Sequence, residues 1–207
     1  LSRHLKDYSA LFNRVSLQLN SSVNANPDET TAERLKNYRN GVADNYLETL
    51  YFQFGRYLLI ASSRAGNLPA NLQGIWLNNI DGPWHCDYHN NINIQMNYWP
   101  AMQDNLQECM QPMIDYIKTL IKPGAVTARS YYGARGWTTS VSSNPFGFTA
   151  PLRDNAMSYN LCPAAGPWLA THLWEYYDYT RDINWLRTEG YPIIKVAAEL
   201  AQDYLCK

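Results

Sequence analysis

The stretch Gly82–Pro100 reads GPWHCDYHNNINIQMNYWP, and the rest of the chain is interpreted outward from it. Polar and apolar residues alternate along it between Trp84 and Trp99. Because an extended chain turns successive side chains to opposite faces, the alternation predicts one polar and one mostly apolar face. The polar face would carry Asp87, His89, Asn91, Asn93 and Gln95, and the other face Tyr88, Asn90, Ile92, Ile94 and Met96.

A half-buried strand with one solvated face would show the same alternation. Two observations favour a binding surface instead. The rest of the chain reads as helix, so a lone extended segment is out of place. The polar face also carries amides and an imidazole, where a solvated face would more often carry Lys and Glu. Groups that both donate and accept hydrogen bonds suit sugar hydroxyls or an attacking water molecule.

Most of the remaining chain has helical periodicity. The clearest run is 44–62, in which only Gln53 and Arg56 are strongly polar between Leu50 and Ala61. Such a helix is expected to be buried within something larger, so that Arg56 needs an acceptor. Further helices are expected over 1–19, 105–121, 125–132, 167–177, 183–189 and 193–204.

Local motifs refine this prediction of an all-α array of antiparallel helices. Asn105-Leu-Gln-Glu108 predicts a capping box, Pro112 a kink, and Asp182 an N-cap. Loops are expected over 66–86 and 133–163, and long loops in compact domains tend to be functional. Trp76 and Trp84 lie in the first loop, where they would line a pocket mouth or anchor the loop.

Composition excludes several classes of partner. The 207 residues carry a net charge of −1 without a basic stripe, so no nucleic-acid partner is expected. No apolar run approaches the ~20 residues of a membrane span. Seven Trp and sixteen Tyr suit either a large aromatic core or rings that stack on sugars. The start at Leu1 and the end inside an apolar-periodic segment predict a piece of a longer polypeptide.

The cysteines give no sign of a metal site. Their spacing lacks the short pairs of a zinc site, and free thiols are favoured over disulfides. No metal and no cofactor is therefore expected. The four residues are Cys86, Cys109, Cys162 and Cys206.

The string His89-x-Asn91-x-Asn93-Ile-Gln-Met-Asn-Tyr-Trp-Pro resembles the signature of the bacterial α-L-fucosidases of glycoside hydrolase family 95. Two further strings, 52–60 and 71–76, resemble flanking motifs of that family. The resemblance implies that residues 42–207 form about half of an (α/α)6 toroid, a six-hairpin catalytic domain, preceded by a helical linker and loop over 1–41. It also implies a periplasmic or secreted protein, with a β-domain and the remaining barrel helices in the same polypeptide.

Hydrolysis of a glycosidic bond usually takes two carboxyl groups. The candidates in this chain form no convincing pair; they are Asp87, Glu108, Asp154, Glu175 and Asp178. The resemblance implies an inverting enzyme whose Glu acid and Asp lie beyond this chain, and in which Asn91 and Asn93 orient the attacking water. It assigns His89 to sugar contact, and Trp168 either to substrate contact or to a buried helix start.

The substrate is implied to be a terminal α-L-fucosyl residue on an oligosaccharide or glycan. One departure matters: many members continue Gly-Trp with His-His-Asn-Thr-Asp, whereas this chain reads Gly136-Trp-Thr-Thr-Ser-Val-Ser-Ser-Asn144. An α-L-galactosidase of the same family and a non-catalytic carbohydrate-binding relative therefore remain alternatives. A related phosphorylase would need a basic phosphate-binding cluster, which the sequence lacks.

We expect residues 1–207 alone to be catalytically silent, because the resemblance places the general acid outside them. Turnover of an activated aryl α-L-fucoside by the purified chain measures this. Hydrolysis above that of a mock preparation would contradict the expectation.

Overall fold

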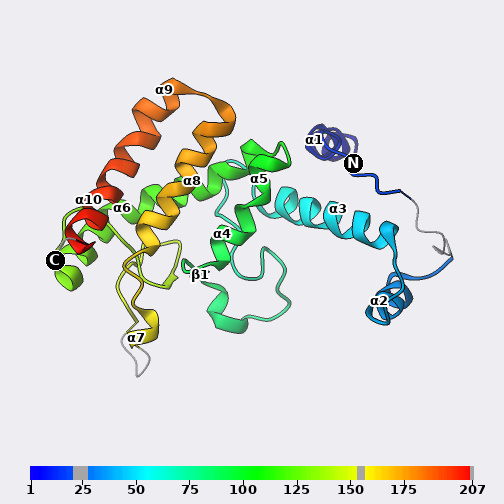
Figure 1. The fold of residues 1–207 in the computed structure, drawn as a ribbon, viewed down its shortest axis with the longest axis horizontal. Coiled ribbons are helices and arrows are strands. Elements are labelled where there is room, and N and C mark those ends of the chain that lie inside the picture. The colour runs from blue at the N-terminus through cyan, green and yellow to red at the C-terminus, as the bar shows by residue number, and fades with distance from the viewer. Residues whose placement is uncertain (21–27, 153–156, 206–207) are drawn as a thin grey trace. The chain divides into compact units, whose positions relative to one another are not determined.

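The computed structural model describes residues 1–20, 28–152 and 157–205 (Figure 1). Helices dominate it, and its strands are two residues long, which confirms the all-α prediction for the described residues. The chain forms two compact units, Leu1–Ala61 and Ser62–Lys207. The closed toroid and the limit between residues 41 and 42 stay predictions.

The first unit contains α1 (Ser2–Phe12), α2 (Thr31–Arg39) and α3 (Asn45–Ser62). The helix expected over 1–19 ends at Phe12. Helix α2 was not expected from the periodicity, but Thr30 and Glu33 form a reciprocal capping box at its start. A buried ion pair of 2.7 Å between Arg34 and Asp44 then links α2 to the start of α3.

Arg56 of α3 is 1% exposed and finds the acceptors that its burial requires. Its Nη1 donates to the carbonyl oxygens of Phe12 and Val15, each at 2.9 Å, and Nη2 donates to that of Leu11 at 3.3 Å. The last carbonyls of a helix lack intrahelical donors and attract positive charge. The guanidinium therefore fastens the end of α1 against the middle of α3.

The second unit is built on three long helices: α6 (Gln111–Tyr132), α8 (Ala165–Thr180) and α10 (Tyr191–Leu205). Helices α8 and α10 pack side by side, and α6 contacts both (Figure 1). The shorter elements of the second unit are η1 (Pro83–Cys86), β1 (Tyr88–His89), α4 (Asn93–Tyr98), α5 (Pro100–Gln103), η2 (Gln107–Met110), β2 (Ser142–Ser143), α7 (Met157–Asn160), α9 (Ile183–Trp185) and η3 (Leu186–Gly190). Fully buried side chains of α6 and α8 form much of the core: Met113, Ile114, Ile117, Leu120, Leu169 and Leu173.

Three local predictions around α6 are wrong. Asn105 has a left-handed φ of 55°, and η2 begins after it without a side-chain cap, so there is no capping box. Pro112 does not kink a helix, because it lies in the first turn of α6, where a missing N–H costs nothing. The helices expected over 105–121 and 125–132 are one, since α6 continues through Pro123.

The N-cap at Asp182 is confirmed. Its Oδ1 accepts hydrogen bonds from the backbone N–H groups of Asn184 and Trp185, at 3.0 and 2.9 Å. The chain then stays helical through α9, the π-turn η3 and α10. The helices expected over 183–189 and 193–204 therefore form one run, with Pro192 in the first turn of α10.

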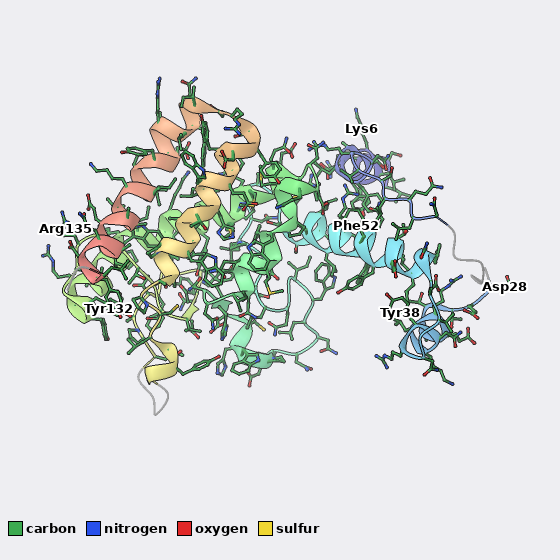
Figure 2. The ribbon with its side chains drawn as sticks, viewed as in Figure 1. Lys6, Asp28, Tyr38, Phe52, Tyr132 and Arg135 are labelled. Carbon is green, nitrogen blue, oxygen red and sulfur yellow. The ribbon has the colours of Figure 1, made fainter. Side chains whose placement is uncertain are left out.

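The end of α6 is fastened to the end of α10 (Figure 2). The ring of Tyr132 lies edge-on to that of Tyr204, and Arg135 forms an ion pair of 2.8 Å with Asp203. Gly136 passes so close to α10 that an added Cβ would lie 2.1 Å from the carbonyl oxygen of Val196. Its φ of +74° is also one that residues other than glycine rarely adopt.

Gly136→Ala should therefore destabilise the chain by about 2 kcal/mol or more, since both backbone strain and a clash with backbone oppose it. Urea denaturation of residues 1–207 measures the change. Gly55→Ala is the matched control, because a Cβ there meets no described atom within 4 Å. That control should gain about 1 kcal/mol from helix propensity. Equal stability of the two variants would contradict the account of Gly136.

Candidate active site

The extended segment predicted within 82–100 is wrong on both sides of Tyr88 and His89. Only Tyr88 and His89 of this stretch form a strand, paired antiparallel with Ser143 and Ser142. A turn follows, and α4 begins at Asn93. The buried residues of α4 are Ile94, Gln95 and Tyr98, a helical spacing rather than an alternating one. Asn91 and Asn93 therefore do not share one face of a strand.

The approach to β1 is a left-handed turn. Trp84, His85 and Cys86 have φ values of 57°, 56° and 53°. For residues other than glycine this conformation costs about 1 kcal/mol or more each. Gly82 makes the turn possible, because a Cβ at that position would lie 2.3 Å from Cys86 Sγ. The turn brings the ring of Trp84 edge-on to that of His89, with centroids 5.7 Å apart.

A pocket of about 170 Å³ lies beside this turn. It brings together three of the predicted site residues, Trp84, His89 and Asn93, and adds Leu72 and Tyr159. An aromatic wall next to a few polar groups is typical of a small-ligand site. Tyr159 of α7 was missed by the sequence interpretation, because nothing in its loop-rich surroundings links it to a stretch 70 residues earlier in the chain.

Three predicted residues do not line this pocket. The Asn91 side-chain oxygen is buried without a hydrogen-bond partner among the described residues. Trp76 lies in the loop over 66–86 and is 43% exposed. Trp168 is half-buried in the first turn of α8, where its carbonyl oxygen lies 3.2 Å from His172 Nδ1. The structure thus brings half of the six predicted residues together.

Asn90, which the alternation placed on the apolar face, is the central polar residue of this region and is fully buried. Its Nδ2 donates to the carbonyl oxygen of Ser140 at 3.1 Å, and its Oδ1 accepts from the Tyr116 hydroxyl at 2.9 Å. Its backbone N–H donates to the carbonyl oxygen of Val141 at 2.7 Å, and its carbonyl oxygen accepts from Gln95 Nε2 at 2.7 Å.

The tyrosines around Asn90 are neutral members of the core. Burial raises the pKa of Tyr88 to about 12 and also raises the pKa of Tyr116. Their rings lie 4.7 Å apart, and Tyr88 donates its hydroxyl to the carbonyl oxygen of Pro69 at 3.2 Å. Neither hydroxyl is therefore available as a base near neutral pH.

The segment in which this chain departs from the resembling family pairs with the strand that carries the pocket histidine. Trp137, Thr138 and Thr139 are fully buried. Ser142 pairs with His89 across the β1–β2 ladder. None of the residues of this segment is among those that line the pocket.

Among the described carboxylates named from the sequence, Asp87 lies against a pocket residue, His89. Glu175 accepts a hydrogen bond from Gln103, and Asp178 pairs with Arg181 at 3.3 Å. Glu108 is exposed on η2, and Asp154 lies outside the described residues. A larger cavity of about 490 Å³ lies elsewhere in this unit and holds none of the predicted residues; its lining is Met102, Asn105, Gln107, Tyr179 and Thr180.

Within the described ranges no group of three or more His, Cys, Asp or Glu side chains is arranged to hold a metal ion. In that same part of the chain, no helix combines the length and the apolar character that crossing a membrane requires. Cys86, Cys109 and Cys162 form no disulfide within the described residues, and Cys206 lies outside them.

Comparison with known proteins decides the family. Residues 1–207 match the glycosyl hydrolase family 95 catalytic domain. The chain belongs to this family. The family 95 chain is 45% identical to an alpha-L-fucosidase 2 of Arabidopsis thaliana and 42% identical to a probable alpha-fucosidase A of Aspergillus niger. Each alignment covers 100% of this chain, and 25% and 26% of the two relatives.

A probable alpha-fucosidase A of Aspergillus oryzae is 38% identical over 80% of the family 95 chain and 23% of that relative. The chain thus spans about a quarter of the length of the curated relatives it matches. These relatives come from a plant and from fungi, and the bacterial part of the predicted resemblance stays a prediction.

Asn90→Ala should destabilise the family 95 domain by about 2–4 kcal/mol, because it removes buried hydrogen bonds to the Ser140 carbonyl oxygen and the Tyr116 hydroxyl. Tm should fall, because it decreases with the free energy of unfolding. Calorimetry of the complete polypeptide measures the shift. Asn78→Ala is the control, since Asn78 is exposed in the loop before η1. A Tm unchanged by Asn90→Ala would contradict the role assigned to Asn90.

Proposed function

We propose that this chain supplies the sugar-binding and water-orienting side of an inverting α-L-fucosidase, which removes terminal α-L-fucosyl residues from oligosaccharides or glycans. The observation that carries the proposal is the pocket in which Trp84, His89 and Asn93 meet, in a chain of family 95. Fucose is proposed as the sugar because the plant and fungal relatives are named as fucosidases.

Each pocket residue is proposed to make a different contact, according to the chemistry of its side chain. The Trp84 ring offers an apolar face to the sugar, and the ring of His89 offers a hydrogen bond to a hydroxyl. The Asn93 amide both donates and accepts, so it holds a water molecule in a fixed orientation. An amide oxygen is barely basic, so a carboxylate behind the water has to draw its proton away.

Asn91 is the second amide of the proposal. Its buried oxygen lacks a hydrogen-bond partner among the described residues, and it lies in the turn just before α4. The two amides therefore flank the start of α4 rather than a strand face. We assign the general acid Glu and the carboxylate behind the water to the remainder of the polypeptide, which also supplies the β-domain and the other barrel helices.

The remaining parts of the proposal rest on the family resemblance. Trp76 and Trp168 are proposed as further substrate contacts. A periplasmic or secreted location and a bacterial source also stay predictions.

Asn93→Ala in the complete polypeptide should lower kcat by about 100-fold or more, the scale of acid–base assistance, with little change in KM. The substrate is an aryl α-L-fucoside. Asn91→Ala should act on the same water, so the double variant should lose less than the product of the single losses. Asn78→Ala is again the control, expected to leave both constants unchanged.

Parallel losses of Tm and kcat in Asn93→Ala would assign its amide to folding rather than to the water. Proton NMR of the first sugar released tests inversion, for which β-L-fucose is expected. An aryl α-L-galactoside, assayed beside the fucoside, separates the two sugar specificities. Binding of fucose without turnover of either glycoside would favour a non-catalytic carbohydrate-binding relative.

A further inference from the structure

The carboxylate of Asp87 touches the pocket histidine and has no role in the function proposed above. Asp87 Oδ1 lies 2.5 Å from His89 Nδ1, and the two side chains are 18% and 10% exposed. Both atoms are fully buried, and neither makes an aligned hydrogen bond to any described residue. They are close together, but their present angle is not that of a hydrogen bond.

A buried acceptor and a buried ring nitrogen are costly to leave unpaired. A small rotation about either side chain aligns the two atoms, and the carboxylate is an obligate acceptor when ionised. The two atoms are therefore each other's hydrogen-bond partners, with His89 Nδ1–H donating to Asp87 Oδ1. A hydrogen bond at one ring nitrogen fixes the tautomer and so determines whether the other nitrogen donates or accepts a hydrogen bond.

The backbone around this pair is fixed on both sides. His89 is held in the β1–β2 ladder opposite Ser142. Asp87 ends the left-handed turn, and its N–H donates to the carbonyl oxygen of Trp84 at 3.3 Å. The Trp84 ring packs edge-on against the imidazole. The imidazole thus has little freedom except rotation of its own ring, and that rotation is what the carboxylate restrains.

We infer that Asp87 is a positioning residue, which holds His89 so that the other ring nitrogen, Nε2, accepts a hydrogen bond from a hydroxyl of the bound sugar. This inference rests on the proposed function, because it needs the pocket to bind a sugar. Asp87 itself acts through His89 and not on the glycosidic bond. It is consequently neither the general acid nor the base of the reaction.

The experiment is a double-mutant cycle in the complete polypeptide with an aryl α-L-fucoside as substrate. Asp87→Ala should raise KM by about 10-fold, the lower end of the loss seen when a partner that orients a metal-binding histidine is removed. Asp87→Asn keeps an acceptor oxygen for Nδ1–H and should lose less. The double variant Asp87→Ala/His89→Ala should be no worse than His89→Ala, since Asp87 acts through that ring.

The same loop supplies a matched control. Asp81 Oδ1 lies 3.7 Å from His85 Nδ1, but both of those side chains are about 90% exposed. Asp81→Ala should leave KM unchanged, because an exposed pair of this kind is worth little. Calorimetry of each variant separates a loss of binding from a loss of folding.

Losses that multiply in the double variant would overturn the inference, as would a KM of Asp87→Ala equal to that of the wild type. Should Asp87→Ala not fold, Asp87→Asn completes the same cycle. A wild-type protein that turns over neither the fucoside nor the galactoside refutes the proposed function, and this inference with it. An active wild type with multiplying losses refutes the inference alone.

Discussion

The pocket depends on the satisfied amide of Asn90. Through one residue, four parts of the second unit meet: the end of β1, the start of α4, helix α6 and the segment before β2. An amide suits this position because it donates and accepts at once, and in a buried site each unmade bond is costly. The positions of the neighbouring His89 and Asn93 follow from these hydrogen bonds of Asn90. Polar residues inside the core thus determine where the pocket residues stand.

The helical parts of the fold could be predicted from the sequence wherever a long apolar stripe exists. Helix α3 and the N-cap at Asp182 are where periodicity and capping chemistry place them. Short elements could not be predicted in this way. The alternation from Asp87 to Met96 fits a strand, yet the buried set of α4 is helical, because tertiary packing of Ile94 and Tyr98 outweighs a pattern only ten residues long.

The composition of the pocket was predictable only in part, and for a physical reason. His89, Asn93 and Trp84 are close in sequence, so a local motif was enough to group them. Tyr159 reaches the same pocket through a long-range contact that no spacing encodes. The left-handed turn at Trp84–Cys86 could not be predicted either. None of its residues is a glycine, and other residues rarely adopt a left-handed conformation.

The burial of residues 137–143 bears on how relatives of this domain should be compared. These residues hold the strand that carries His89, yet none of them lines the pocket. An alignment restricted to pocket-lining positions would therefore leave out buried residues on which the position of His89 depends. A comparison of relatives has to include this buried segment as well as the lining.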